Sequence, residues 1–274
     1  MSSPIITLTT DFGNKDPFVG IMKGVILNIN PGAVIIDLNH KIAPQDVRGG
    51  AFSILNSYRY FPKGTIHVVV IDPGVGSARK PIAVKTTDNI FIGPDNGVMS
   101  WAMIDNPPFF AHEIKNSDFM LKEVSTTFHG RDIFAPAAAQ LSKLSYKYKK
   151  FAKSNFWESL GPEVKSPVLI PFPEPKTIGQ EIIGEILHID RFGNLITNIR
   201  QNRSIKYLQV AIRGIDKIEI NGLSKTYDES IDGAIILLQG STNFLEIAKK
   251  GESAAKALKA KVGDEIRMIF KADS

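Results

Sequence analysis

The amino-acid sequence predicts an α/β N-terminal domain with a central, mostly parallel sheet, followed by a small C-terminal domain built as an antiparallel β-barrel-like sheet. Three observations predict this fold class. Strand and helix patterns alternate through the first half of the chain. Five prolines then fall within fourteen residues, from Pro162 to Pro175, which is typical of a stiff, extended segment. Beyond that segment, short β-branched runs alternate with turn residues, as they do in antiparallel sheets.

The first half of the chain is expected to alternate strands with helices. Asp16 and Pro17 suit the cap and the first turn of a helix, and the Asn-Pro-Gly run at 30–32 ends that helix. The near-continuous apolar run at 65–72 is typical of a strand buried on both faces of a parallel sheet. The expected strands are 5–10, 33–38, 65–72, 82–86 and 90–92, and the expected helices lie near 18–29, 51–58 and 131–144.

The second half is expected to be mostly β structure, with turns such as Phe192-Gly193-Asn194 between strands. The expected strands are 182–189, 195–199, 208–212, 234–239, 244–248 and 265–270. At 274 residues the chain is long enough for two cores. We therefore predict an α/β domain over 1–165, a proline-rich linker over 166–180 and a β-barrel-like domain over 181–274.

Composition excludes several function classes. The chain has no cysteine, which excludes disulfides, thiolate metal sites and a cysteine nucleophile. Its net charge of +5 is too small and too dispersed to indicate a nucleic-acid partner, and the basic run at 143–153 is interpreted as a solvated helix end. The N-terminus lacks the basic and apolar regions of a signal peptide. Uninterrupted apolar runs stop at about five residues, far short of a membrane span. We expect a soluble, cytoplasmic protein with no membrane partner.

Three aspartates lie at the carboxyl ends of the first three expected strands, where an open parallel sheet binds its ligands. Asp37 is expected to cap the following loop. Asp11 lies in the polar turn Thr9–Gly13, and its carboxylate can accept two hydrogen bonds from a vicinal diol such as that of ribose. Asp72 opens a glycine-rich loop that ends at Arg79. That loop lacks the third glycine of a dinucleotide fingerprint and leads into a strand, so we do not expect a phosphate cradle.

His129 lies between Phe128 and Gly130, directly before an expected helix. The helix dipole should lower the pKa of His129 and favour a neutral imidazole, which can accept a proton from water. Each of these features also has a structural interpretation. Asp72 and Arg79 suit a simple ion pair, and a lone histidine is more often structural than functional. The histidines show no metal-ligand spacing and no HExxH motif is present.

Three further polar turns stand out. The turn at 93–97 is expected to lead into a helix holding Val98 and Trp101. The segments 188–194 and 239–243 lie between apolar strands and carry carboxylate, amide and hydroxyl groups. Either segment suits the binding of a zwitterion or a purine edge, and either also suits an ordinary hairpin.

Four motifs taken together resemble one family. They match, in order and spacing, the S-adenosyl-L-methionine (SAM) hydroxide adenosyltransferases, which are adenosine-forming SAM hydrolases related to the fluorinase and chlorinase enzymes. The resemblance covers nearly the whole chain. The motifs are Thr9-Thr10-Asp11-Phe12-Gly13, Asp72-Pro73-Gly74-Val75-Gly76, Phe128-His129-Gly130-Arg131-Asp132 and Asp190-Arg191-Phe192-Gly193-Asn194.

The resemblance implies a role for each matched residue. Asp72, Arg79 and His129 would be the catalytic, water-activating triad. Asp11 would hold the ribose hydroxyls, Asp190 the methionine amino group and Asn194 the adenine edge. Ser241 would meet the methionine carboxylate, and Glu246 would line the adenosine pocket. The family further implies a homotrimer whose sites combine the N-terminal domain of one subunit with the C-terminal domain of the next.

The activity implied is hydrolysis of SAM by in-line attack of water at the ribosyl C5′, giving adenosine and L-methionine. A sulfonium leaves as a neutral thioether, so neither a cofactor nor a metal is needed. Two departures from the family pattern stand out. Lys250 lies where relatives tend to have asparagine, which affects the expected adenine contacts. The inserted loop of the halogenases is absent, which favours water over halide as the nucleophile.

Three alternatives remain open from the sequence. One is a non-catalytic sensor of SAM or adenosine. Another is a halide-using adenosyl transferase. The third is a metal-dependent hydrolase that uses Asp11, Asp72, Asp95 and His129.

Overall fold

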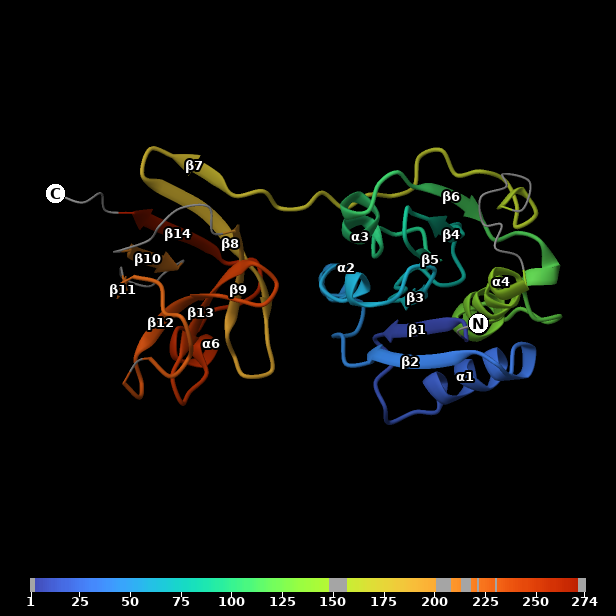
Figure 1. Ribbon diagram of the computed structural model, residues 1–274, viewed down its shortest axis with the longest axis horizontal. Helices are drawn as coiled ribbons and strands as arrows, with labels where there is room; N and C mark the ends of the chain where they lie inside the picture. Colours follow the sequence, from blue (N-terminus) through green and yellow to red (C-terminus); the bar gives the residue numbers. More distant parts are fainter. Residues whose placement is uncertain are drawn as a thin grey trace. The chain divides into compact units, whose positions relative to one another are not determined.

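The structure is a computed structural model. It describes residues 3–147, 157–200, 208–212, 218–220, 222–229 and 231–270. The chain divides into two compact units, Met1–Pro171 and Phe172–Ser274 (Figure 1). Each unit has its own hydrophobic core. The basic run expected to be a solvated helix end extends beyond residue 147, and its later part lies outside the described residues.

The N-terminal unit is built on a six-stranded sheet with the order β2-β1-β3-β5-β4-β6. The four strands β2, β1, β3 and β5 run parallel, whereas β4 is antiparallel to both of its neighbours. The predicted mostly parallel sheet is therefore confirmed. The strands are β1 (Ile5–Thr10), β2 (Val34–Asn39), β3 (Ile66–Val70), β4 (Pro81–Lys85), β5 (Ile90–Pro94) and β6 (Phe110–Glu113).

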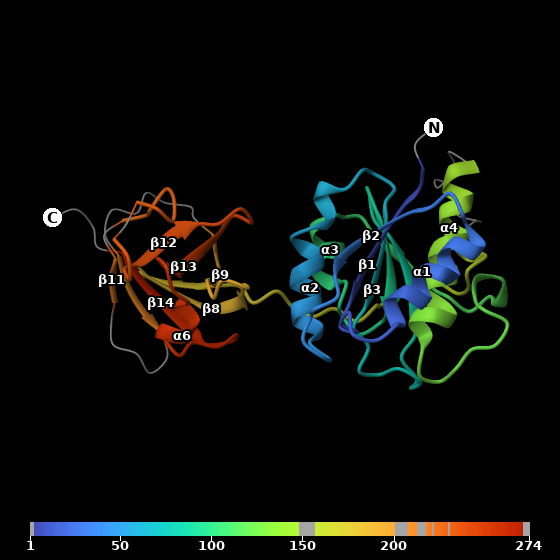
Figure 2. The same ribbon diagram turned by 90° about the horizontal axis from the view of Figure 1, so that it is seen from below.

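Helices cover both faces of this sheet, as Figure 2 shows. One face carries α1 (Phe18–Ile29) and α4 (Ala135–Lys147), which pack against each other. The other carries α2 (Val47–Leu55) and α3 (Ser100–Asp105). Short helical turns lie at η1 (Tyr58–Tyr60), η2 (Ser117–Phe119) and η3 (Gly130–Phe134). This three-layer arrangement buries β1 and β3 on both sides, which explains the near-continuous apolar sequence of β3; in β1, three buried threonines accompany the apolar residues.

The C-terminal unit is a strongly curled, half-barrel antiparallel sheet, as the sequence predicted. Its strand order is β11-β10-β14-β8-β9-β13-β12, with β7 paired to β8, and the short helix α6 (Ala254–Ala257) packs beside β13. The strands are β7 (Lys176–Ile178), β8 (Glu181–Ile189), β9 (Leu195–Arg200), β10 (Leu208–Ile212), β11 (Ile218–Ile220), β12 (Ile235–Gln239), β13 (Phe244–Lys249) and β14 (Glu265–Phe270).

The structure corrects several local expectations. Helix α1 begins at Phe18, and Pro17 occupies its cap position without a side-chain hydrogen bond, so Asp16 is not the cap. Gly93 and Pro94 belong to β5 rather than to a turn. The sequence analysis missed β6, β7, β11 and α6, which have only three or four residues each and lack a sustained apolar period.

The start of the proline-rich segment packs against the N-terminal unit. The backbone N–H of Val168 donates to Asp95 Oδ1 at 2.8 Å, and Trp101 Nε1 donates to the carbonyl of Ile170 at 3.1 Å. This stretch is therefore part of the surface of that unit. Among the described residues, no helix has the length and apolar character that crossing a membrane requires.

Candidate active site

The carboxyl ends of β1 and β3 lie side by side and carry two of the candidate aspartates. Thr10, the last residue of β1, pairs in register with Val70 of β3. Asp11 follows directly after Thr10, and Asp72 follows two residues after Val70. Both carboxylates therefore leave the sheet at the edge where open α/β sheets bind ligands.

Arg79 joins Asp72 and His129 into one cluster. Its Nε donates to Asp72 Oδ1 at 3.0 Å, and its Nη2 donates to Asp72 Oδ2. The same Nη2 lies 2.7 Å from Nδ1 of His129. The Asp72 and Arg79 side chains are only 5% and 8% exposed, so their ion pair is shielded from solvent. The structure thus brings together the three residues predicted to form the triad.

The contact with Arg79 determines which nitrogen of His129 carries the proton. A guanidinium can only donate hydrogen bonds, so Nδ1 of His129 is the acceptor and the neutral ring carries its proton on Nε2. Burial lowers the pKa of His129, and the positive charge of Arg79 lowers it further, against the opposing charges of Asp72 and Asp132. The sequence analysis expected the helix dipole to lower the pKa of His129. In the structure, burial and the charge of Arg79 are the main causes of the lowered pKa.

A widened helical turn presents His129. The five residues of η3 form a π-helix, in which the N–H of Ala135 donates to the carbonyl of Gly130. Upstream, the N–H of Ser125 donates to the buried Asp132 at 2.9 Å, and Phe128 N–H donates to Ser125 Oγ at 3.0 Å. Turns of this kind occur often at functional sites.

Two contacts tie the histidine segment to the other candidate loops. Phe12, Phe18 and Phe128 form an edge-to-face cluster with ring centroids 5.3–5.9 Å apart. Gly76, in the loop after Asp72, has a φ of +76°, and a Cβ there would lie 2.4 Å from the carbonyl oxygen of Thr126. Only glycine allows this approach of the two backbones.

Asp11 is half-buried, and its Oδ2 accepts a hydrogen bond at 2.8 Å from the backbone N–H of Gln45. Gln45 has a φ of +67°, an uncommon conformation for a residue other than glycine. The sequence analysis did not single out Gln45, because its role depends on backbone conformation rather than on residue type.

Asp37 does not cap the backbone as expected; it binds two side chains instead. Lys23 Nζ donates to Asp37 Oδ2 at 2.6 Å, and Asp37 Oδ1 lies 3.0 Å from Nε2 of His40. Burial raises the pKa of Asp37, but the hydrogen bonds from Lys23 and His40 outweigh that effect and lower it.

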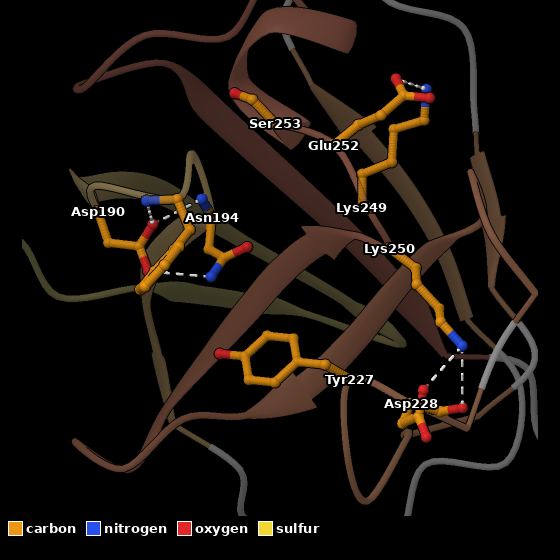
Figure 3. Close-up of a pocket in the computed structure, with 10 residues that line it drawn as sticks. Asp190, Asn194, Tyr227, Asp228, Lys249, Lys250, Glu252 and Ser253 are labelled. Atoms are coloured by element: carbon orange, nitrogen blue, oxygen red, sulfur yellow. Dashed lines mark hydrogen bonds and ion pairs between the residues drawn. The ribbon is translucent and has the colours of Figure 1, made fainter.

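The C-terminal unit holds a pocket of about 680 Å³, shown in Figure 3. Asp190 and Asn194 lie on one wall. Asp190 Oδ1 accepts from the N–H groups of Phe192 and Asn194, and Asp190 Oδ2 accepts from Asn194 Nδ2, each at 2.9 Å. Because Nδ2 is engaged, Asn194 Oδ1 points away from Asp190 as a hydrogen-bond acceptor (Figure 3).

A tight turn shapes this wall of the pocket. Gly193 has a φ of +88°, and a Cβ there would lie 2.0 Å from Ser253 Oγ. The same turn leaves the Phe192 ring 77% exposed at the pocket. The segment is therefore a hairpin turn between β8 and β9, and it places Asn194 and Phe192 at the pocket.

Tyr227 lines the pocket, and the predicted site residue Glu246 lies behind it. Tyr227 Oη donates to Glu246 Oε2 at 2.9 Å. Burial and this hydrogen bond raise the pKa of Tyr227 to about 12, and burial raises the pKa of Glu246. Ser241 is exposed in the loop between β12 and β13 and does not line this pocket. The structure thus brings Asp190, Asn194 and Glu246 to one region and leaves Ser241 outside the pocket wall.

Two lysines lie on the opposite wall, each paired with an acid (Figure 3). Lys249 Nζ binds Glu252 at 2.7 Å, and Lys250 Nζ binds Asp228 at 2.9 Å. Lys250 is thus directed at the segment that carries Tyr227. Tyr227 was missed by the sequence analysis because its surroundings carry no motif. The sequence analysis identified Lys250 only as a departure from the family pattern.

The described residues contain no group of three or more histidine, aspartate or glutamate side chains placed to hold a metal ion. Asp95, which the metal-dependent alternative requires, accepts instead from the backbone of Val168. Burial raises the pKa of Asp95. Among the described residues, Asp95 is thus not part of a ligand group with Asp11, Asp72 and His129.

Fold and site define a class of protein: a two-unit chain with an Asp–Arg–His cluster at the edge of an α/β sheet and an amide- and aromatic-lined pocket in a curled antiparallel sheet. Residues 6–151 match the model of the SAM hydroxide adenosyltransferase N-terminal domain, and residues 184–267 match that of the C-terminal domain. The chain belongs to the SAM hydroxide adenosyltransferase family.

Relatives of similar length support this membership. A protein of Methanocaldococcus jannaschii named (R)-S-adenosyl-L-methionine hydrolase is 37% identical, over 97% of this chain and 96% of its own. A protein of the same name from Thermus thermophilus is 35% identical, over 95% and 97%. The crystal structure of an uncharacterised conserved protein from Thermotoga maritima superposes with a TM-score of 0.88 at 33% identity, covering 96% of this chain and 99% of that one.

Proteins named fluorinase are more distant relatives. The one from an Actinoplanes species is 26% identical over 95% of this chain. The relation to fluorinases that the sequence motifs indicated is therefore confirmed.

Proposed function

We propose that this protein hydrolyses SAM by in-line attack of water at the ribosyl C5′, giving adenosine and L-methionine. The observation that carries the proposal is the shielded cluster of Asp72, Arg79 and His129 at the carboxyl edge of the sheet. It is supported by the full-length relatives, which are named for this hydrolysis of the (R) sulfonium form.

The N-terminal unit would supply the reacting water. Water is a poor nucleophile because its pKa is about 15.7, so its position in line with the C5′–S bond matters most. Holding a reactant in place can lower a barrier by about 7–11 kcal/mol at best. The Nε2–H of His129 is a donor that can orient the water oxygen. Arg79 Nη1, buried and without a hydrogen-bond partner among the described residues, is a second donor in the cluster.

Asp72 is the better candidate for the proton acceptor. The Nδ1 lone pair of His129 is occupied by Arg79 and its Nε2 carries a proton, so the neutral ring has no nitrogen left to accept another. Asp72 keeps lone pairs on both oxygens while Arg79 holds the carboxyl group in place. As the C5′–O bond forms and the C5′–S bond breaks, the water proton passes to Asp72 and methionine leaves as a neutral thioether.

The C-terminal unit would bind the adenine and methionine ends of the substrate. The acceptor Oδ1 of Asn194 suits the amino group of adenine, and the rings of Phe192 and Tyr227 suit a purine face. The carboxylate of Asp190 would bind the ammonium group of methionine. The hydroxyl of Ser241 would donate to the methionine carboxylate. Glu246 would act through Tyr227. Asp11 would accept from the ribose hydroxyls.

We further propose a cytoplasmic homotrimer in which residues of both units contribute to each site. The support is the resemblance of the motifs to the family, together with the division of the candidate ligands between Asp11 in one unit and Asp190 and Asn194 in the other.

Incubation with SAM alone, in halide-free buffer, tests the function. The (R) and (S) sulfonium forms are supplied separately, and products are separated by chromatography. We expect adenosine and methionine from the (R) form. Binding without product would instead identify a sensor, and product only on addition of halide would identify a halogenase. Activity that is lost with a chelator and restored by one divalent ion would identify a metal-dependent hydrolase.

A further inference from the structure

A chain of hydrogen-bonded side chains runs from the surface of the N-terminal unit to the turn after β1. Lys23 donates to Asp37 at 2.6 Å, Asp37 lies 3.0 Å from Nε2 of His40, and Nδ1 of His40 lies 2.9 Å from Thr10 Oγ1. Thr10 is fully buried and His40 is 6% exposed. The reaction proposed above uses none of these four residues.

The chemistry of the groups sets the direction of each hydrogen bond. A carboxylate only accepts, so Nε2 of His40 carries a proton and donates to Asp37. In the tautomer with the proton on Nε2, Nδ1 is an acceptor and the hydroxyl of Thr10 donates to it. Thr10 Oγ1 in turn accepts from the backbone N–H of Phe12 at 3.2 Å. Every link of the chain then has one donor and one acceptor.

This chain ends on the turn that carries Asp11. Thr10 holds the N–H of Phe12, and the N–H of Gly13 donates to the backbone carbonyl of His40 at 2.8 Å. The Asp11 carboxylate itself is held by the N–H of Gln45 through Oδ2. The segment from His40 to Gln45 therefore makes three hydrogen bonds to residues 10–13.

We propose that Thr10, His40 and Asp37 are positioning residues that orient Asp11 toward the vicinal diol of ribose. A carboxylate accepts from two neighbouring hydroxyls only when its plane is correctly oriented, so a rigid turn should set selectivity for ribonucleosides over nucleosides that lack the diol. This inference rests on the ribose-binding role of Asp11 proposed above.

The experiment measures binding of adenosine and of 2′,3′-dideoxyadenosine to the full-length protein by calorimetry. Thr10→Val removes the hydroxyl at nearly constant shape, and Thr10→Ser restores it. Thr9→Val is the matched control. Thr9 is the neighbouring residue of β1, is also fully buried, and its Oγ1 has no hydrogen-bond partner among the described residues. Asp37→Ala breaks the same chain at a side chain that is 43% exposed, where the risk to folding is small.

The quantity compared is the ratio of the two dissociation constants. Thr10→Val should reduce the preference for adenosine about tenfold, which corresponds to one hydrogen bond to a charged group. Binding of the dideoxy compound should not change. Asp37→Ala should act in the same direction, Thr10→Ser should restore the preference, and Thr9→Val should leave it intact.

Two results would overturn the inference, and they are distinguishable. If wild-type protein prefers adenosine but Thr10→Val retains that preference, or loses affinity for both compounds equally, the chain has only a structural role. If wild-type protein binds both compounds equally, Asp11 does not bind the ribose diol, and the proposed role of Asp11 fails together with the inference.

Discussion

Arg79 determines the chemistry of the candidate site more than any other single residue. One guanidinium binds both oxygens of Asp72, donates to His129 and lies over the ring of Phe134 at 5.3 Å. Lysine offers a point charge without this planar fork, so it cannot make both contacts in the same geometry. The positions of Asp72 and His129 relative to each other thus depend on one side chain.

Three substitutions should distinguish residues that act on the reaction rate from a residue that acts on SAM binding. Asp72→Asn and His129→Ala should lower the single-turnover rate about 10²- to 10⁴-fold with SAM binding nearly unchanged, because both residues act on the water. Asp11→Ala should instead weaken binding roughly ten- to a hundred-fold, since its bonds to the ribose exist before the reaction begins. Dissociation constants and single-turnover rates of the three variants provide the measurement.

Circular dichroism of each variant controls for folding. Wild-type turnover by His129→Ala would show that His129 has only a structural role. Equal losses of rate and affinity in Asp72→Asn would mean that Asp72 contacts the substrate before the reaction.

His67 should make the protein sensitive to acid. It is fully buried in β3, stacked on Phe91, and burial lowers its pKa from 6.5 to about 3. Below pH 6.5 the unfolded chain takes up a proton that the folded protein does not, so stability falls as the pH drops from 6.5 toward 3. The loss is about 1.4 kcal/mol per pH unit, or roughly 2 kcal/mol at pH 5.

Urea unfolding at pH 7.5 and pH 5.0 measures this effect. Between these two pH values, the free energy of unfolding of the wild-type protein should fall by about 2 kcal/mol more than that of His67→Asn. The asparagine retains a polar group near Thr7 but does not titrate. An identical loss in both proteins would assign the acid sensitivity to other groups.

At the scale of elements, the loop between β3 and β4 must approach the segment before η3 closely. Gly76→Ala should lower stability by about 2–3 kcal/mol and slow turnover at least about tenfold, because its Cβ would strike the carbonyl of Thr126 and separate Arg79 from His129. Gly64→Ala is the matched control: its φ is +88°, but no atom lies within 4 Å of the added Cβ. Gly64→Ala should lower the stability only by the cost of placing alanine in a left-handed backbone conformation, about 1 kcal/mol, and its turnover should be normal.

Thermal unfolding and turnover of both variants test this prediction. If the two variants behave alike, the contact between Gly76 and Thr126 does not position the cluster.

The element scale also shows what the sequence could predict. Strand β3 was predictable because burial on both faces favours a near-continuous apolar run, and β1, β10 and β14 were predicted with their observed bounds. The edge strand β6 was not predictable, since its four residues include both His112 and Glu113. The π-turn at η3 was also missed, because it has the same composition as an ordinary helix start.

The candidate site was predictable to the extent that residue type carries the chemistry. Asp72, Arg79 and His129 could be grouped from motifs, and the structure places them in contact. Gln45 and the chain from Lys23 to Thr10 depend on tertiary contacts between segments up to 34 residues apart, and no local pattern records them. Ser241 shows the converse, because a residue matched by motif need not line the pocket.

At the scale of the whole molecule, the proposed trimer predicts complementation between inactive variants. Asp72→Asn slows the reaction in the N-terminal unit and Asn194→Ala weakens binding in the C-terminal unit, so each homotrimer should be nearly inactive when SAM is well below the dissociation constant of the Asn194→Ala protein. If each site takes one unit from each of two neighbouring subunits, every mixed trimer has one intact site. Equal mixing should then restore about a quarter of wild-type turnover.

The two proteins are unfolded together, refolded and assayed, with each refolded alone as the control. Recovery of activity only on joint refolding is expected. Persistent inactivity of a sample shown by native mass spectrometry to contain mixed trimers would mean that each site lies within one subunit.

The five-residue π-turn that precedes α4 affects the rotation of that helix about its own axis relative to His129. An ordinary α-helix advances about 100° per residue, so the additional residue in η3 sets the angle between His129 and the buried alanine face of α4. A homologue one residue shorter between its histidine and that alanine face would keep the same helix packed in the core, but its histidine would point about 100° away from the arginine. Such a chain would carry all three residue types of the cluster in the right order and still be unable to assemble it.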